Sequence, residues 1–187
     1  MSDVTTGSAP APGTVLDSAA ELSEFADQIA DQIESFLVVV RALARGDAPE
    51  SVVPMLLLEV SQLLLAGGRL GAVQDVVPEE RFEEDPGPDP DLDELREKLA
   101  ELLKPCDTYR EIFDPLAVQP ELEVRRISDD IASAVSDLAH GLTHHRAGRT
   151  LEALWWWQFS YLTDWGPAAS AAVRALQSIV ARSRLRD

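Results

Sequence analysis

The sequence has few of the residues and patterns that carry well-known enzyme chemistry. It contains one cysteine, Cys106, so an internal disulfide is excluded. It has no glycine-rich phosphate loop, no Cys-x-x-Cys pair, no His-Glu-x-x-His motif and no nucleophile elbow. These absences favour a protein without catalytic activity, and we expect no cofactor.

Long apolar runs are also missing. No uninterrupted apolar run reaches the roughly 18 residues of a membrane-spanning helix. The first 13 residues lack the basic and then apolar order of a secretory signal. We therefore expect a cytoplasmic protein with no membrane partner.

Basic side chains are scarce relative to acidic ones. The chain has 33 Asp and Glu against 16 Lys and Arg, a net charge of -17. Residues 1–139 carry a net charge of -20, whereas residues 140–187 carry +3. Such an excess of negative charge repels phosphate backbones, so we expect no direct binding to nucleic acid.

Apolar side chains recur at helical spacing along most of the 187 residues. The first stripe consists of Leu22, Phe25, Ile29, Ile33, Phe36, Val40 and Leu43. A second helix, apolar nearly all round, is predicted over 52–66, with Gly67 and Gly68 as its stop. A third is expected from about Asp91 or Asp93 to Lys104, closed by a proline.

The second half of the chain continues the helical pattern. Ser128 is predicted to cap a fourth helix, a turn around Gly148 leads to a fifth that ends at Gly166, and Pro167 begins a sixth. Residues 105–127 carry three prolines and are expected to form one or two helical turns between loops. No strand pair is predicted.

These elements predict an all-α fold in a single-domain bundle of five to six helices. Residues 1–15 are expected to be a disordered tail, and 16–187 the helical domain. Within that domain, an acidic, proline-rich connector is expected over about 75–90.

The fifth helix concentrates the aromatic residues of the chain. They are Trp155, Trp156, Trp157, Phe159, Tyr161 and Trp165. Three consecutive tryptophans point about 100° apart and cannot all face one neighbour. Either other helices surround this one, or one aromatic face is exposed and binds a protein partner, a dimer mate or an apolar ligand.

All three histidines lie near the end of the fourth helix. Asp137, His140 and His144 share one stripe at i, i+3 and i+7, which could ligate a divalent metal if Glu59 or Glu152 completed the site. The alternative is an ordinary polar helix face. Glu59 itself lies in a very apolar helix and either faces water or is buried with a partner or a proton.

Several segments resemble a known family. FADQIADQIESFL, LLLEVSQLLLAGGRLG and EALWWWQFSYL look like bacterial proteins grouped as domain of unknown function 5063, over about residues 24–181. The resemblance implies an actinobacterial cytosolic protein. It implies no activity, cofactor or site residues.

Three hypotheses for function follow. The first is a non-catalytic module for protein interaction or self-association that uses the aromatic helix. The second is a metal- or small-molecule-binding helical enzyme built on Asp137, His140, His144 and a glutamate. The third is an acidic protein that occupies the nucleic-acid site of a DNA-handling partner.

Overall fold

The computed structural model describes residues 13–16, 18–47, 49–79, 90–112 and 114–185. The helices in chain order are α1 (Ala19–Ala44), α2 (Val52–Ala72), α3 (Pro90–Leu102), α4 (Ile127–Arg146), α5 (Thr150–Ser160) and α6 (Gly166–Leu185). A 3₁₀ turn, Pro49–Ser51, precedes α2, and a π-helical turn, Tyr161–Trp165, joins α5 to α6. Two strands, β1 (Thr108–Ile112) and β2 (Leu122–Arg126), lie between α3 and α4.

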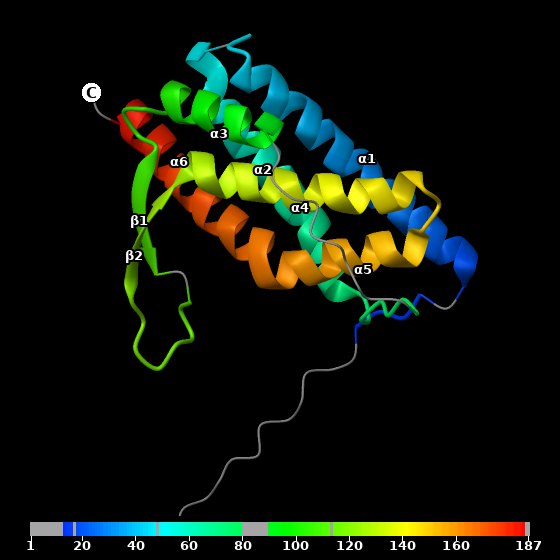
Figure 1. Ribbon diagram of the computed structural model, residues 1–187. Coiled ribbons are helices and arrows are strands. Elements are labelled where there is room, and N and C mark those ends of the chain that lie inside the picture. Colours follow the sequence, from blue (N-terminus) through cyan, green and yellow to red (C-terminus); the bar gives the residue numbers. More distant parts are fainter. Residues whose placement is uncertain (1–12, 17, 48, 80–89, 113, 186–187) are drawn as a thin grey trace, which may run out of the picture.

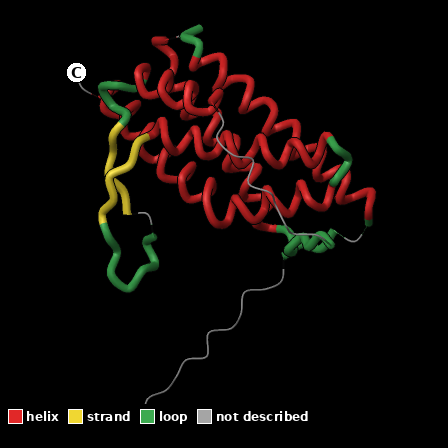
Figure 2. Tube along the Cα trace, in the orientation of Figure 1, coloured by secondary structure: helices red, strands yellow, loops and turns green. Residues whose placement is uncertain are grey.

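The molecule is a single-domain, all-α bundle from which one hairpin projects (Figures 1 and 2). The helices pack in neighbouring pairs, chiefly α4 with α5, α2 with α6, α3 with α4, and α1 with α2. Side chains from every helix meet in one hydrophobic core. The predicted fold class is confirmed.

The first helix begins and ends where its sequence signals place it. Ser18 and Glu21 form a capping box, in which the Glu21 amide donates to Ser18 Oγ at 3.1 Å and Ser18 N donates to Glu21 Oε2 at 3.0 Å. Beyond the last turn Gly46 has a φ of 82°, which favours glycine. The predicted stripe faces inward from Phe25 to Leu43.

Helix α2 is longer than predicted. The prediction that Gly67 and Gly68 end it is wrong, because the helix continues to Ala72. A Cβ atom on Gly67 would overlap the rings of Tyr161 and Trp165, so this glycine makes room for aromatic side chains. Two adjacent glycines are typical of a helix end, and close packing by a distant residue leaves no local trace in the sequence.

By length and composition, Pro49–Ala72 is the one stretch in the described residues that could cross a membrane. In the structure, however, Leu56, Val60, Leu63 and Leu70 are buried in the bundle core. Core packing accounts for these four side chains, whereas Leu58 and Leu65 of the same helix are 49% and 64% exposed.

The expectation of a disordered tail over 1–15 is wrong at its end. Thr14 N donates to the carbonyl of Ala72, and Gln74 N donates to the carbonyl of Thr14, both at 2.9 Å. These bonds form a parallel bridge to the chain after α2. Residues 1–12, and 80–89 of the predicted acidic connector, lie outside the described residues.

The hairpin contradicts the prediction of helical turns over 105–127. Strands β1 and β2 pair antiparallel, with register from Thr108↔Arg126 to Ile112↔Leu122. They are only five residues each and mostly exposed, so they lack the long apolar alternation by which strands are recognised. Pro115 and Pro120 lie in the connecting loop, where proline disturbs no ladder bond.

The start of α4 is capped by a residue that is distant in sequence. Ser128 does not act as the predicted cap, because Asp107 takes that place. Asp107 Oδ1 accepts from Ser128 N at 2.8 Å, and its Oδ2 accepts from Ser128 Oγ at 2.9 Å. Arg126 Nε donates to the same Oδ2 at 2.9 Å, which ties the hairpin base to the helix.

Candidate interaction surface on helix α5

Helix α5 has apolar side chains on all sides. Those on its inner face are buried in the bundle, and those on its outer face are partly or largely exposed. Ala153, Leu154, Trp157 and Gln158 are buried on the inner face. The contacts of α5 are mainly with α4, with further contacts to α1 and α2. On the outer face Phe159 and Leu162 are exposed, and Leu151 lines a hollow with Leu16 and with Leu22 of α1. Figure 1 shows α5 at the edge of the bundle.

Trp157 is a core residue. It is fully buried, and its indole N–H donates to the carbonyl of Leu138 at 3.2 Å. A Cβ atom on Gly141 of α4 would overlap this indole, so the ring fits only because position 141 is glycine. Trp157 is therefore not available to a partner.

Trp156 lies at the seam between α4 and α5 and is half-buried. Its indole N–H donates to the carbonyl of Asp137 at 2.8 Å. The centre of its ring lies 4.5 Å from that of His140. These contacts hold Trp156 against α4.

The outer face carries a continuous apolar stripe at i, i+4, i+8 and i+11. We call it the outer stripe; it consists of Leu151, Trp155, Phe159 and Leu162. Leu151 is 39% exposed, Phe159 49% and Leu162 57%, while Trp155 is half-buried. The rings of Trp155 and Phe159 stack with centroids 5.8 Å apart and planes 18° apart, so the two side chains support each other on this face.

The remaining predicted aromatics pack inward. Tyr161 is half-buried against Gly67 and Gly71 of α2, and Trp165 is fully buried with its ring 4.8 Å from that of Tyr161. Of the six aromatic residues proposed from sequence, the structure leaves Trp155 and Phe159 on the outer face. Leu151 and Leu162, which sequence reasoning did not single out, complete the stripe.

The predicted histidine stripe lies on one face of α4. The His140 and His144 rings meet edge to face at 5.1 Å, and Asp137 precedes them by one turn. Burial raises the pKa of the Asp137 carboxyl to about 7, and the negative charge of Asp164 adds to this shift. Asp137 Oδ2 is buried and has no hydrogen-bond partner among the described residues.

The structure does not assemble the predicted metal site. No group of three or more His, Cys, Asp or Glu side chains within the described residues could hold a metal ion. Glu59 lies between α1 and α2, and Glu152 is half-buried on α5. The five residues Asp137, His140, His144, Glu59 and Glu152 therefore do not converge on one ion.

Sequence reasoning missed a buried ionic network at the hairpin base. Asp130 is 3% exposed; its Oδ2 accepts from Tyr109 Oη at 2.6 Å, and its Oδ1 accepts from Arg125 Nε at 3.1 Å. Burial raises the pKa of the Tyr109 hydroxyl, and the bond to Asp130 raises it further. Only the strand register, which the sequence did not reveal, brings these three residues together.

Comparison with protein families identifies one match. The family described as domain of unknown function (DUF5063) matches residues 20–182. The chain belongs to this family. No curated protein matches it.

Among solved structures, the chain is similar to the crystal structure of protein BF1032 from Bacteroides fragilis. The sequence identity is 17% and the TM-score 0.64, over 81% of this chain and 89% of that one. At this identity the likeness concerns the fold alone.

Proposed function

We propose that this protein is a non-catalytic interaction module that self-associates through the outer stripe of α5. The observation that carries the proposal is the stripe itself. Its four large apolar side chains share one helix face, and its two aromatic rings are already stacked. Exposed aromatic residues that are held rigidly lose little entropy on binding, and for this reason they concentrate binding energy.

Charge distribution along α5 is compatible with a second copy as the occupant. The chain carries a net charge of -17, yet Glu152 is the only charged side chain between Leu151 and Leu162. Two copies that meet stripe to stripe keep most of their acidic side chains out of the contact. A two-fold symmetric contact of this kind needs only one self-complementary patch.

The outer stripe would form the centre of such an interface. Specific interfaces bury about 800 Å² on each partner, more than four side chains supply, so neighbouring polar residues form the rim. The stacked Trp155 and Phe159 rings would supply most of the free energy of association.

Sedimentation equilibrium tests the proposal. The wild-type chain is expected to dimerise in the micromolar range, and Phe159→Glu should weaken association at least about 10-fold because it buries a charge without a partner. The control is Gln177→Glu, which adds the same charge at an exposed position of α6 and should leave association unchanged. A wild-type chain that stays monomeric at about 100 μM, or equal dimerisation of both variants, overturns the proposal.

A further inference from the structure

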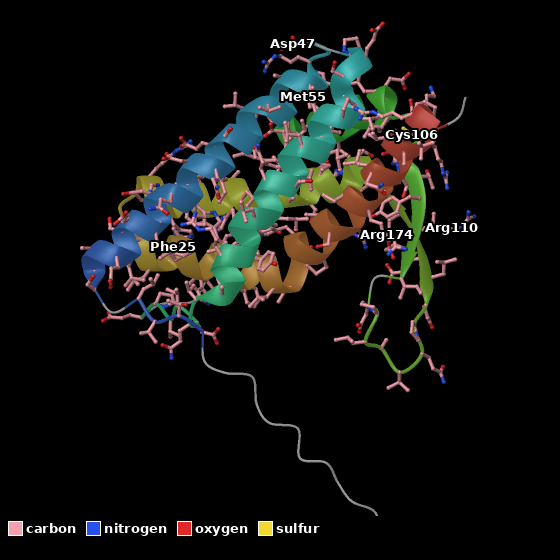
Figure 3. All side chains as sticks on the ribbon, turned by 180° about the vertical axis from the view of Figure 1, so that it is seen from behind. Phe25, Asp47, Met55, Cys106, Arg110 and Arg174 are labelled. Atoms are coloured by element: carbon pink, nitrogen blue, oxygen red, sulfur yellow. The ribbon has the colours of Figure 1, made fainter. Side chains whose placement is uncertain are left out.

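A cavity of about 420 Å³ lies between α1 and α2, on the side of the bundle away from α5. Helix α1 contributes Asp31, Gln32, Ser35 and Phe36, and helix α2 contributes Glu59, Gln62, Leu63 and Leu65. Figure 3 looks onto this side of the molecule, where α1 and α2 lie next to each other. The volume falls within the range of small-molecule sites.

Glu59 is the unusual member of this lining. It is only 7% exposed, and it makes no hydrogen bond or ion pair with any other described residue. A buried carboxylate without a partner is costly, and burial raises the pKa of the Glu59 carboxyl. Asp130, a second buried carboxylate, has both a tyrosine and an arginine as partners.

The other polar groups around the cavity are suited to accept hydrogen bonds. Gln32 Oε1 is buried and has no hydrogen-bond partner among the described residues. Asp31 adds a second carboxylate at the exposed rim, and Ser35 adds a hydroxyl. None of the lining residues is basic, so the cavity offers negative charge and acceptor atoms.

The floor of the cavity is apolar. Phe36 and Leu63 are each 1% exposed, and Leu65 forms part of the wall. An occupant that satisfies both the floor and the acceptors combines a short hydrocarbon chain with a cationic group that donates hydrogen bonds. A bare metal ion fits less well, because no group of three acidic, histidine or cysteine ligands exists in the described part of the chain.

We propose that this cavity binds a small organic cation, an alkylammonium or alkylguanidinium, whose charged group pairs with Glu59. The Gln32 amide oxygen accepts a second hydrogen bond from the same group. The hydrocarbon chain lies on Phe36 and Leu63, and Asp31 attracts the cation at the rim.

Chemical-shift titration by NMR with agmatine, which carries both a guanidinium and an ammonium group, tests the site in 150 mM NaCl. Saturable shifts with a dissociation constant on the order of 1 mM are expected. Glu59→Gln should weaken binding about 10-fold or more, since it removes a charge-assisted pair at constant shape. Neutral n-butanol should produce no saturable shifts.

The matched control is Glu50→Gln, which makes the same change of net charge at an exposed position outside the cavity. Its agmatine affinity should stay within about 2-fold of wild type. Equal affinity in Glu59→Gln and Glu50→Gln, or butanol binding as tight as agmatine, would overturn the proposal.

A second variant keeps the test decisive if Glu59→Gln folds poorly. Gln62→Arg places a tethered guanidinium at the rim, which should occupy the site and abolish agmatine binding. Unchanged binding in Gln62→Arg counts against the site. Because α5 is not involved, Phe159→Glu should bind agmatine like wild type, so this inference and the proposed dimer can fail separately.

Discussion

The two faces of α5 present the same kind of side chain to different surroundings. On the inner face, Trp157 is fully buried and its N–H finds the carbonyl of Leu138. On the outer face, Trp155 and Phe159 stack on each other; Trp155 is half-buried and Phe159 is exposed. Aromatic residues two positions apart in sequence thus serve the core and an accessible surface.

The difference shows what separates a structural aromatic residue from one available for binding. Trp157 is fixed by the donor bond to Leu138 and by a small residue opposite, Gly141. In the outer stripe Leu151, Phe159 and Leu162 stay exposed among the described residues. Substitutions on the inner side should therefore lower stability, whereas substitutions in the stripe should mainly change association.

The largest effect is expected for Gly141→Ala. Its Cβ would overlap the buried indole of Trp157, which has no free space to move, so the free energy of unfolding should fall by about 3 kcal/mol. Gly68→Ala is the control, because nothing lies near a Cβ at that exposed helical position. It should raise stability by about 0.5–1 kcal/mol. Urea unfolding of both variants measures the contrast, and equal losses would contradict the role given to Gly141.

A smaller loss is expected for Gln158→Leu. Gln158 Oε1 accepts from Val76 N, and its Nε2 donates to the carbonyl of Leu70, both at 2.9 Å. A leucine would leave a buried backbone N–H without a partner, which costs about 2 kcal/mol. Gln177→Leu, at an exposed position of α6, should change stability by less than about 0.5 kcal/mol. A thermal melt that ranks the two variants in reverse order would show that Gln158 does not secure the segment after α2.

The smallest effect is a difference in pH dependence between the wild type and Asp137→Asn. The pKa of Asp137 is raised from 3.8 to about 7, so between pH 4 and 7 the folded chain holds a proton that the unfolded chain has lost. This group therefore makes the protein less stable as pH rises through that interval. Asp137 is partly exposed, so we expect about 1 kcal/mol of extra loss between pH 5 and 8 in the wild type relative to Asp137→Asn. Parallel urea titrations at the two pH values check this, and an equal loss in both proteins would count against the raised pKa.

The parts of the fold that were predictable have local causes. The apolar stripe of α1 and the glycine turn before α5 involve residues within one or two helical turns of their neighbours. Such patterns can be recognised because the residues that interact are close in sequence. The exposed aromatic face of α5 was one of two open interpretations, since periodicity cannot show which side other helices cover.

The parts that were missed depend on distant residues. Gly67 serves Tyr161 from almost a hundred positions away, and Asp107 caps a helix that begins twenty residues later. Glu59 was considered for a histidine site, yet the packing of α2 against α1 places it in a separate cavity. These contacts arise from how the helices pack, which the spacing of residues along one helix does not specify.

The π-helical turn at Tyr161–Trp165 determines how α5 and α6 are oriented relative to each other. One residue more than regular α-helix rotates all following side chains about the helix axis by about 100°. The buried faces of α5 and α6 can therefore point in different directions although the helical chain is continuous. The alanine-rich side of α6 can thereby lie on α2, while α5 keeps Trp156 and Trp157 on α4. If the chain were regular α-helix through this point, the buried faces of α5 and α6 would keep one fixed rotational relation. Either the contact of α5 with α4 or the contact of α6 with α2 would then be lost.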